Sequence, residues 1–125
     1  DALKIGDVIV CGSRGWSTPE KDHNTPDDKK IYDRELIRME LSLKAAQKLK
    51  KEGDKTVVMI HYPPFNSRLE RSPFTELYSL YGADAVVYGH LHGKDCRAAK
   101  VVELDGIKYY LTSCDLVSNK LVRIL

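Results

Sequence analysis

Cysteine is scarce in this sequence, with only Cys11, Cys96 and Cys114 among 125 residues. Their odd number and wide spacing argue against a disulfide framework. No Cys-x-x-Cys pair is present, which argues against a zinc ribbon. We therefore interpret the three cysteines as reduced thiols, as expected in a cytoplasmic protein.

Long apolar runs and a strong charge of one sign are also missing. No apolar run reaches the roughly 18–20 residues that span a bilayer, and no charged-then-apolar leader opens the sequence. We therefore predict a cytoplasmic protein with no membrane partner. Lys and Arg number 20 against 18 Asp and Glu, so the formal charge is only +2. This small excess argues against nucleic acid as a partner, except for a small nucleotide as substrate.

The first part of the sequence predicts a strand, a loop and a long helix. Residues 7–12 form a short apolar run closed by glycine, which is typical of a buried strand. Residues 13–28 are polar and rich in turn formers, which predicts a long loop. A helix is predicted from about residue 27 to about residue 52, because Thr25 and Pro26 are suited to its start. Its expected apolar stripe consists of Tyr32, Leu36, Met39, Leu43 and Ala46, widened by Ile37, Leu41 and Ala45.

Two more strands and a short helix are predicted next. Residues 56–60 are apolar and β-rich, which favours a strand covered on both faces. A helix is expected over residues 73–81, because Pro73 suits its first turn and Gly82 stops it. Residues 85–88 predict another short strand.

The remaining residues are predicted to be all β. Residues 98–104 and 107–112 flank an Asp-Gly pair, which indicates a hairpin, and residues 121–125 are expected to form a last strand. The order is then strand, helix, strand, helix, strand and three antiparallel-type strands. This order predicts an α/β core with a β extension, in one domain over residues 1–125.

Three histidines directly follow predicted strands. His61 follows residues 56–60, and His90 and His92 follow residues 85–88. A strand–helix–strand unit joins parallel strands, so both strand ends should lie at one sheet edge, where ligand sites form. In extended backbone, residues two apart project to the same side, so His90 and His92 should face a common centre. Imidazole is a good ligand for zinc, iron, nickel and copper, so we predict a metal site with open positions.

Other side chains have both a functional and a structural interpretation. Arg14 is a candidate substrate-binding residue that could hold a phosphate, or an ordinary surface arginine. Asp115 could orient an imidazole or serve in a turn, and Cys96 could be a soft ligand or an incidental thiol. Trp16 could cover the site or pack its loop onto the domain. His23 is expected to be exposed to solvent in the long loop.

Four segments of the sequence resemble one known family. Residues 59–64, Met-Ile-His-Tyr-Pro-Pro, and residues 88–93, Tyr-Gly-His-Leu-His-Gly, closely resemble the last two motifs of the calcineurin-like metallophosphoesterases. Residues 12–16 and 110–115 also look like a bacterial branch of that family. The resemblance spans nearly the whole sequence.

The resemblance implies a fold, a cofactor and a reaction. The fold would be the C-terminal half of a four-layer α/β/β/α sandwich. The cofactors would be two divalent transition-metal ions (Mn, Fe or Zn), with His61 and His90 on one ion and His92 on the other. Two such ions polarise the phosphoryl oxygens of a phosphate-ester substrate and activate water for in-line attack on phosphorus. Phosphomonoesters and phosphodiesters both stay open as substrates.

The family's first three motifs are missing from this sequence. They are Asp-Xaa-His, Gly-Asp-Xaa-Xaa-Asp and Gly-Asn-His followed by Asp or Glu, and none occurs here. In the family they supply the bridging carboxylate and further ligands. We therefore expect a missing N-terminal portion or a partner chain to complete the site, and we expect the isolated chain to be inactive. Without that portion, strand edges and apolar faces should be exposed.

Two other functions are compatible with the sequence. A non-catalytic binding or regulatory module would keep the fold and bind one metal ion or none. An unrelated mononuclear zinc hydrolase ranks last, because the sequence has no His-Glu-Xaa-Xaa-His motif.

Overall fold

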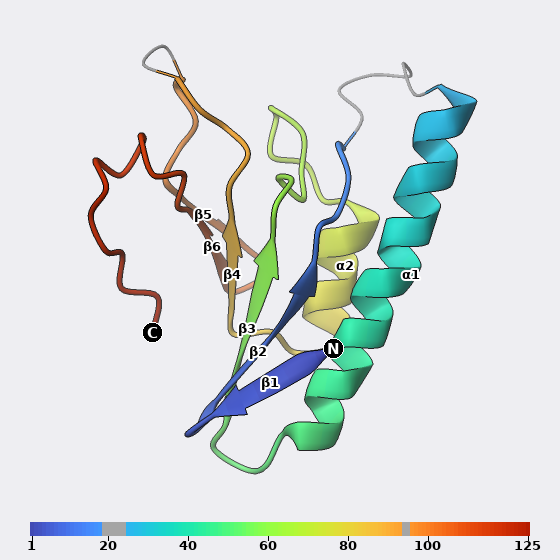
Figure 1. Ribbon diagram of the computed structural model, residues 1–125, viewed down its shortest axis with the longest axis vertical. Coiled ribbons are helices and arrows are strands. Elements are labelled where there is room, and N and C mark those ends of the chain that lie inside the picture. Colours follow the sequence, from blue (N-terminus) through green and yellow to red (C-terminus); the bar gives the residue numbers. More distant parts are fainter. Residues whose placement is uncertain (19–24, 94–95) are drawn as a thin grey trace.

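The computed structural model describes residues 1–18, 25–93 and 96–125. Over these residues the chain is a mixed α/β domain with a six-stranded sheet and two helices (Figure 1). The strands are β1 (Ala2–Ile5), β2 (Val8–Ser13), β3 (Lys55–Ile60), β4 (Ala85–Tyr88), β5 (Val101–Leu104) and β6 (Ile107–Leu111). The helices are α1 (Pro26–Leu49) and α2 (Pro73–Leu80).

The sheet has a parallel centre and antiparallel edges. Its order is β1-β2-β3-β4-β6-β5. Neighbouring strands from β2 to β6 pair in parallel, whereas β1 pairs antiparallel with β2 and β5 pairs antiparallel with β6. The carboxyl ends of β2, β3, β4 and β6 therefore meet at one edge, as expected for strands joined by crossovers.

Most of the predicted strands are confirmed, and the tail differs. The strands predicted at residues 7–12, 56–60 and 85–88 are β2, β3 and β4. The hairpin is also confirmed, because Asp105 and Gly106 both have positive φ, 53° and 77°, as a type I′ turn requires. However, its second strand β6 lies parallel to β4, so the tail is not a run of antiparallel strands.

One prediction about the end of the chain was wrong, and one strand near its start was not predicted. Residues 121–125 form no strand, and Leu121 is fully exposed. The turn before them places Ser118 and Asn119 in the left-handed region, and the segment beyond finds no strand to pair with among the described residues. Strand β1 was not predicted, because four residues are too short a pattern to stand out. It forms through pairing with β2.

Helix α1 begins as predicted and ends a turn earlier. The Thr25 side chain accepts a hydrogen bond from the Asp28 amide at 3.1 Å, which caps the helix. The helix ends at Leu49 rather than near residue 52. It ends there because the amide of Lys51 donates to the Asp54 carboxylate at 2.8 Å, which starts a turn instead. Helix α2 was predicted within one residue, and its first turn is held by a capping box between Ser72 and Thr75.

The buried face of α1 is partly polar. Ile37 and Leu41 were predicted to widen the apolar stripe, but both are exposed. Glu35 and Ser42 are buried in their place, three or four residues from Met39 along the helix. Each has a partner, because Glu35 accepts from arginine side chains and Ser42 accepts from a backbone amide of β2. Satisfied polar groups can therefore occupy a stripe that periodicity alone assigns to apolar residues.

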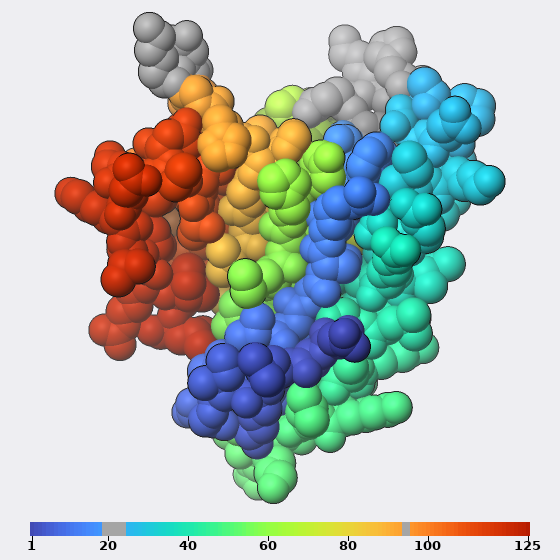
Figure 2. All heavy atoms as spheres, in the orientation of Figure 1, coloured from blue at the N-terminus to red at the C-terminus, as the bar shows by residue number. Residues whose placement is uncertain are grey.

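Both helices cover one face of the sheet, and the hydrophobic core lies between them and that face (Figure 1). The opposite face carries apolar side chains without a covering layer in the described residues. Met59, Val87, Tyr110 and Val101 are register neighbours across this face, and Met59 is 55% exposed. Strand β3 is thus buried on both faces at Val57 and Val58, as predicted, but not at Met59. Figure 2 shows β2, β3 and β4 forming the surface that faces the viewer.

Candidate metal centre

Backbone hydrogen bonds continue past the ends of β2, β3 and β4 and hold the residues that follow these strands side by side. The amide of His61 donates to the carbonyl of Arg14 at 3.1 Å, and the amide of Gly89 donates to the carbonyl of His61 at 3.1 Å. The amide of Thr112, after β6, donates to the carbonyl of Tyr88 at 3.0 Å. The residues singled out in the sequence therefore leave the sheet from adjacent positions on one edge, where ligand sites form in α/β folds.

His61 and His90 are in direct contact at this edge. The Nε2 atom of His61 lies 3.3 Å from the Nδ1 atom of His90, and the ring centroids are 5.2 Å apart. His90 has a φ of 70°, so the backbone turns sharply at this residue. Two nitrogens that each lie about 2.0–2.1 Å from one tetrahedral zinc ion are roughly 3.3 Å apart. The separation of this pair therefore fits a shared transition-metal ion.

The surroundings of His90 favour its neutral form. Its pKa is lowered first by partial desolvation and then by the proximity of His61 and His92, which disfavour another positive charge. A histidine binds a metal through a neutral ring, because the ligand atom must be deprotonated. The electrostatics of the pair thus act in the direction that metal binding needs.

His92 is turned toward a carboxylate instead. Its Nδ1 lies 2.8 Å from Oδ1 of Asp115, and the other oxygen of Asp115 accepts from the Gly93 amide at 2.8 Å. The pKa of Asp115 is lowered by the Gly93 amide and then by His92. Across residues 1–18, 25–93 and 96–125, no group of three or more His, Cys, Asp or Glu side chains is gathered closely enough to hold an ion. The structure thus brings two of the three predicted ligands together.

A cavity of about 290 Å³ lies beside this pair. It opens on the uncovered face of the sheet, because Met59 and Val87 of that face form part of its wall. Arg14 and His61 also line it, so the predicted phosphate-binding residue and one predicted metal ligand share a cavity. The full lining is Ser13, Arg14, Met59, Ile60, His61, Val87, Tyr88, Gly89 and Thr112.

Arg14 is held in place by a buried carboxylate that sequence reasoning missed. Its Nη2 donates to Oε1 of Glu35 at 2.9 Å, and the same oxygen accepts from Arg38 at 3.1 Å. Glu35 is only 1% exposed, whereas about half of the Arg14 side chain is exposed. The signal in the sequence was a glutamate at a stripe position, three residues after Tyr32 and four before Met39. Such a residue needs a cationic partner when it is buried.

Trp16 packs its loop onto the domain. The guanidinium carbon of Arg14 lies 5.0 Å from the centre of the Trp16 ring. The centres of the Trp16 and Tyr62 rings are 5.2 Å apart. The centres of the Tyr62 and His90 rings are in turn 4.6 Å apart. A continuous row of rings therefore connects Arg14 with the histidine pair, and Trp16 is an internal member of this row.

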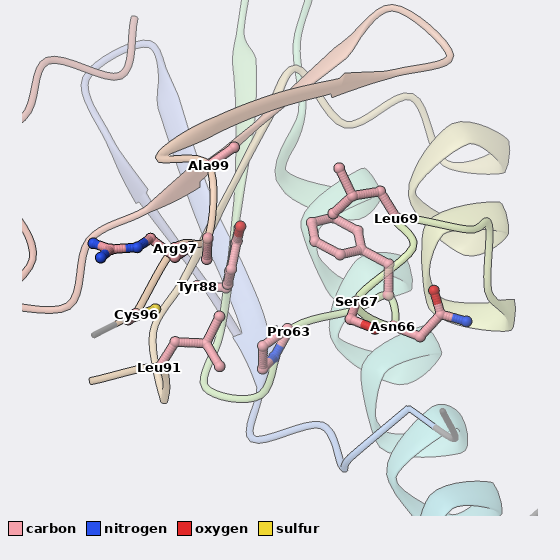
Figure 3. A pocket seen from close by; sticks show the side chains of 11 residues that line it. Pro63, Asn66, Ser67, Leu69, Tyr88, Leu91, Cys96, Arg97 and Ala99 are labelled. Carbon is pink, nitrogen blue, oxygen red and sulfur yellow. The ribbon is translucent and has the colours of Figure 1, made fainter. Parts of the chain in front are cut away.

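A second cavity, of about 570 Å³, lies on the other side of β4 (Figure 3). The Tyr88 side chain enters the core on the helix side, where the centres of the Tyr88 and Phe65 rings are 5.4 Å apart. Leu91, which stands between His90 and His92, lines this cavity, and the guanidinium of Arg97 points away from it (Figure 3). Cys96 also lines it rather than the cavity that contains His61. The lining is Pro63, Phe65, Asn66, Ser67, Leu69, Tyr88, Leu91, Cys96, Arg97, Ala98 and Ala99.

The structure also bears on the predictions about the cysteines and membrane-spanning segments, while the prediction for His23 is not tested. Cys11, Cys96 and Cys114 are all free thiols. His23 lies outside the described residues. Neither helix of the described chain has the length and apolar character needed to cross a membrane. No protein-family model matches the chain, and a comparison with curated proteins finds no match either.

Proposed function

We propose that this chain is the C-terminal part of a metal-dependent phosphoesterase of the calcineurin-like class. The observation that carries the proposal is the 3.3 Å contact between ring nitrogens of His61 and His90 at the carboxyl ends of adjacent parallel strands. The sequence motifs around these residues resemble that class, and the separation of the two nitrogens suits a transition-metal ion.

Each residue of the candidate centre has a role in this proposal. His61 and His90 hold one ion, and His92 offers its Nε2 atom to the second. Arg14 lines the same cavity as His61 and binds the substrate phosphate, while Glu35 holds its guanidinium. When bound, divalent ions polarise phosphoryl oxygens and lower the pKa of water. Two imidazoles in contact and a third on Asp115 do not form a complete dinuclear site, so further ligands must come from elsewhere.

The uncovered face of the sheet indicates where those ligands come from. The cavity with His61 opens on this face, and the same face carries exposed apolar residues such as Met59 and Leu3. An apolar sheet face of this kind requires a second layer. We propose that an N-terminal portion or a partner chain packs there, completes the four-layer sandwich and supplies the bridging carboxylate. Phosphomonoesters and phosphodiesters both remain candidate substrates.

Metal uptake by the purified chain tests the centre directly. Equilibrium dialysis against Zn²⁺ or Mn²⁺, followed by elemental analysis, should show bound metal in the wild-type chain. His61→Ala and His90→Ala should each weaken uptake by at least tenfold, while His23→Ala, which removes the fourth histidine of the sequence, should leave uptake unchanged. A folded chain that takes up no metal would contradict the proposal and favour the non-catalytic binding module.

Activity provides the second test. The isolated chain should not hydrolyse p-nitrophenyl phosphate or bis-p-nitrophenyl phosphate, because the bridging carboxylate is missing from it. Supplying the upstream portion or partner chain should produce metal-dependent hydrolysis that is lost in His90→Ala. Metal-dependent turnover by the purified 125-residue chain alone would show that the site is not divided in this way.

A further inference from the structure

We infer that Asp115 is a positioning residue that fixes the His92 ring so that Nε2 is its metal-binding atom. The inference rests on the proposed metal centre and adds a residue to it. Asp115 lies 23 positions after His92, in the turn that follows β6, and the sequence alone left it open whether this residue orients an imidazole or serves in a turn.

The hydrogen bond decides which nitrogen of His92 is available. A carboxylate can only accept hydrogen bonds, so the Nδ1 atom that lies 2.8 Å from Asp115 must carry the proton. In the neutral ring this leaves the lone pair on Nε2. A carboxylate behind the imidazole also fixes the ring's orientation and raises its basicity, as is common for metal-ligating histidines.

Asp115 restrains the backbone of the same loop. Its second oxygen accepts from the Gly93 amide at 2.8 Å, so one carboxylate holds both the side chain of His92 and the peptide that follows it. The loop needs this restraint, because Gly93 has a φ of 104° and His92 lies in an exposed segment. A simple surface ion pair would account for the first contact and would leave the amide contact unexplained.

The anchor itself is supported by a hydrogen-bonded turn. The amide of Leu116 donates to the carbonyl of Ser113 at 3.0 Å, and the amide of Asn119 donates to the carbonyl of Cys114 at 2.8 Å. This turn directly follows β6, which lies parallel to β4. The ends of two parallel neighbours therefore bring the carboxylate to the histidine loop, and the sheet topology sets their distance.

Nuclear magnetic resonance of the histidine rings in the full 125-residue chain tests the inference. At pH 8, where imidazoles are largely neutral, long-range proton–nitrogen spectra distinguish the two tautomers. His92 should be in the Nδ1–H form in the wild-type chain and should shift toward the Nε2–H form in Asp115→Ala. Addition of Zn²⁺ should move the Nε2 resonance of His92, and Asp115→Ala should weaken Zn²⁺ binding by about 10–100-fold.

Two variants serve as controls. Asp27→Ala removes an exposed carboxylate from the first turn of α1 and should change neither the tautomer nor the affinity. Asp115→Asn keeps one oxygen that can accept from Nδ1, so it should retain the tautomer and lose less affinity than the alanine variant. Circular dichroism of each variant shows whether the fold is retained.

The outcomes separate the inference from the proposed function. An unchanged His92 tautomer in Asp115→Ala would overturn the inference whatever the metal result. If Zn²⁺ moves the resonances of His61 and His90 but leaves Nε2 of His92 unmoved even when the upstream portion or partner chain is supplied, the inference is overturned and the metal centre stands. If Zn²⁺ moves none of the three rings, the proposed metal centre fails, and the role of Asp115 in it fails as well.

Discussion

The Nε2 atom of His61 lies 3.3 Å from the Nδ1 atom of His90, although 29 positions separate the two residues in the sequence. The parallel pairing of β3 with β4 explains this contact, because Ile60 and Tyr88 are register partners directly before the two loops. The contact also shows which ring atom each histidine directs toward the shared space. This atom is Nε2 in His61 and Nδ1 in His90.

This difference predicts opposite responses to amide substitutions. The side-chain oxygen of asparagine occupies a place similar to Nδ1 of histidine, and the oxygen of glutamine reaches a place similar to Nε2. His90→Asn should therefore retain more Zn²⁺ affinity than His90→Gln, whereas His61→Gln should retain more than His61→Asn. Calorimetric titration of the four variants measures the order. The same order at both positions would contradict the assignment of ligand atoms.

Gly12 should be essential to the pairing of β2 with β3. A Cβ atom at this position would lie 1.8 Å from the carbonyl oxygen of Met59, and the φ of Gly12 is 139°. Gly12→Ala should therefore lower the free energy of unfolding by roughly 3 kcal/mol, measured by denaturant titration. Gly53→Ala is the matched control, because Gly53 also has positive φ but a Cβ there meets nothing within 4 Å. A smaller loss for Gly12→Ala than for this control would contradict the steric argument.

The arginines around Glu35 should show strong coupling. Arg14 and Arg38 both donate to Oε1 of this buried carboxylate, at 2.9 and 3.1 Å, and Arg34 is more distant at 3.6 Å. Arg14→Ala alone should cost little, because Arg38 still pairs with Glu35. The double variant Arg14→Ala/Arg38→Ala should cost about 1–2 kcal/mol more than the sum of the single variants, since a poorly paired buried carboxylate remains. Additive losses in a double-mutant cycle would show that neither arginine depends on the other.

Local patterns predicted the elements and the site edge, because they depend on short stretches of sequence. The apolar run before His61 and the run before His90 each identify a strand, and the helix between them implies parallel pairing. The sequence left Asp115 open between orienting an imidazole and serving in a turn, and the particular contacts of Glu35 and Asp115 could not be predicted in this way. They depend on which loops meet across the folded sheet, 21 positions apart for Arg14 with Glu35 and 23 for His92 with Asp115.

The wrong predictions for the tail have the same origin. Residues 121–125 are apolar enough for a strand, but a strand needs an edge to pair with, and the local pattern does not say whether one is in reach. Strand β1 is the opposite case, because its four residues form a strand only through the adjacent edge of β2. Pairing across the sheet decided both outcomes.

The hairpin of β5 and β6 should depend on pH through one ion pair. Arg71, just before α2, donates to both carboxylate oxygens of Asp105 in the hairpin turn, with Nε at 3.1 and 3.0 Å and Nη2 at 2.8 Å. The hydrogen bonds from Arg71 hold the pKa of Asp105 below its usual range. A carboxyl group whose folded pKa is lowered contributes stability above its unfolded pKa, and that stability is lost as the pH falls through the folded value.

Asp105→Asn isolates this contribution, because asparagine tolerates the φ of 53° at this position and removes only the charge. The wild-type chain should have the higher melting temperature at pH 6, and the difference should disappear as the pH falls below the lowered pKa of Asp105. Thermal unfolding by circular dichroism over this range measures the difference. Arg71→Lys keeps the charge but loses the two-pronged geometry, so its melting temperature at pH 6 should lie between those of the wild-type chain and Asp105→Asn. If the difference persists unchanged at low pH, the turn conformation of Asp105 matters and the ion pair does not.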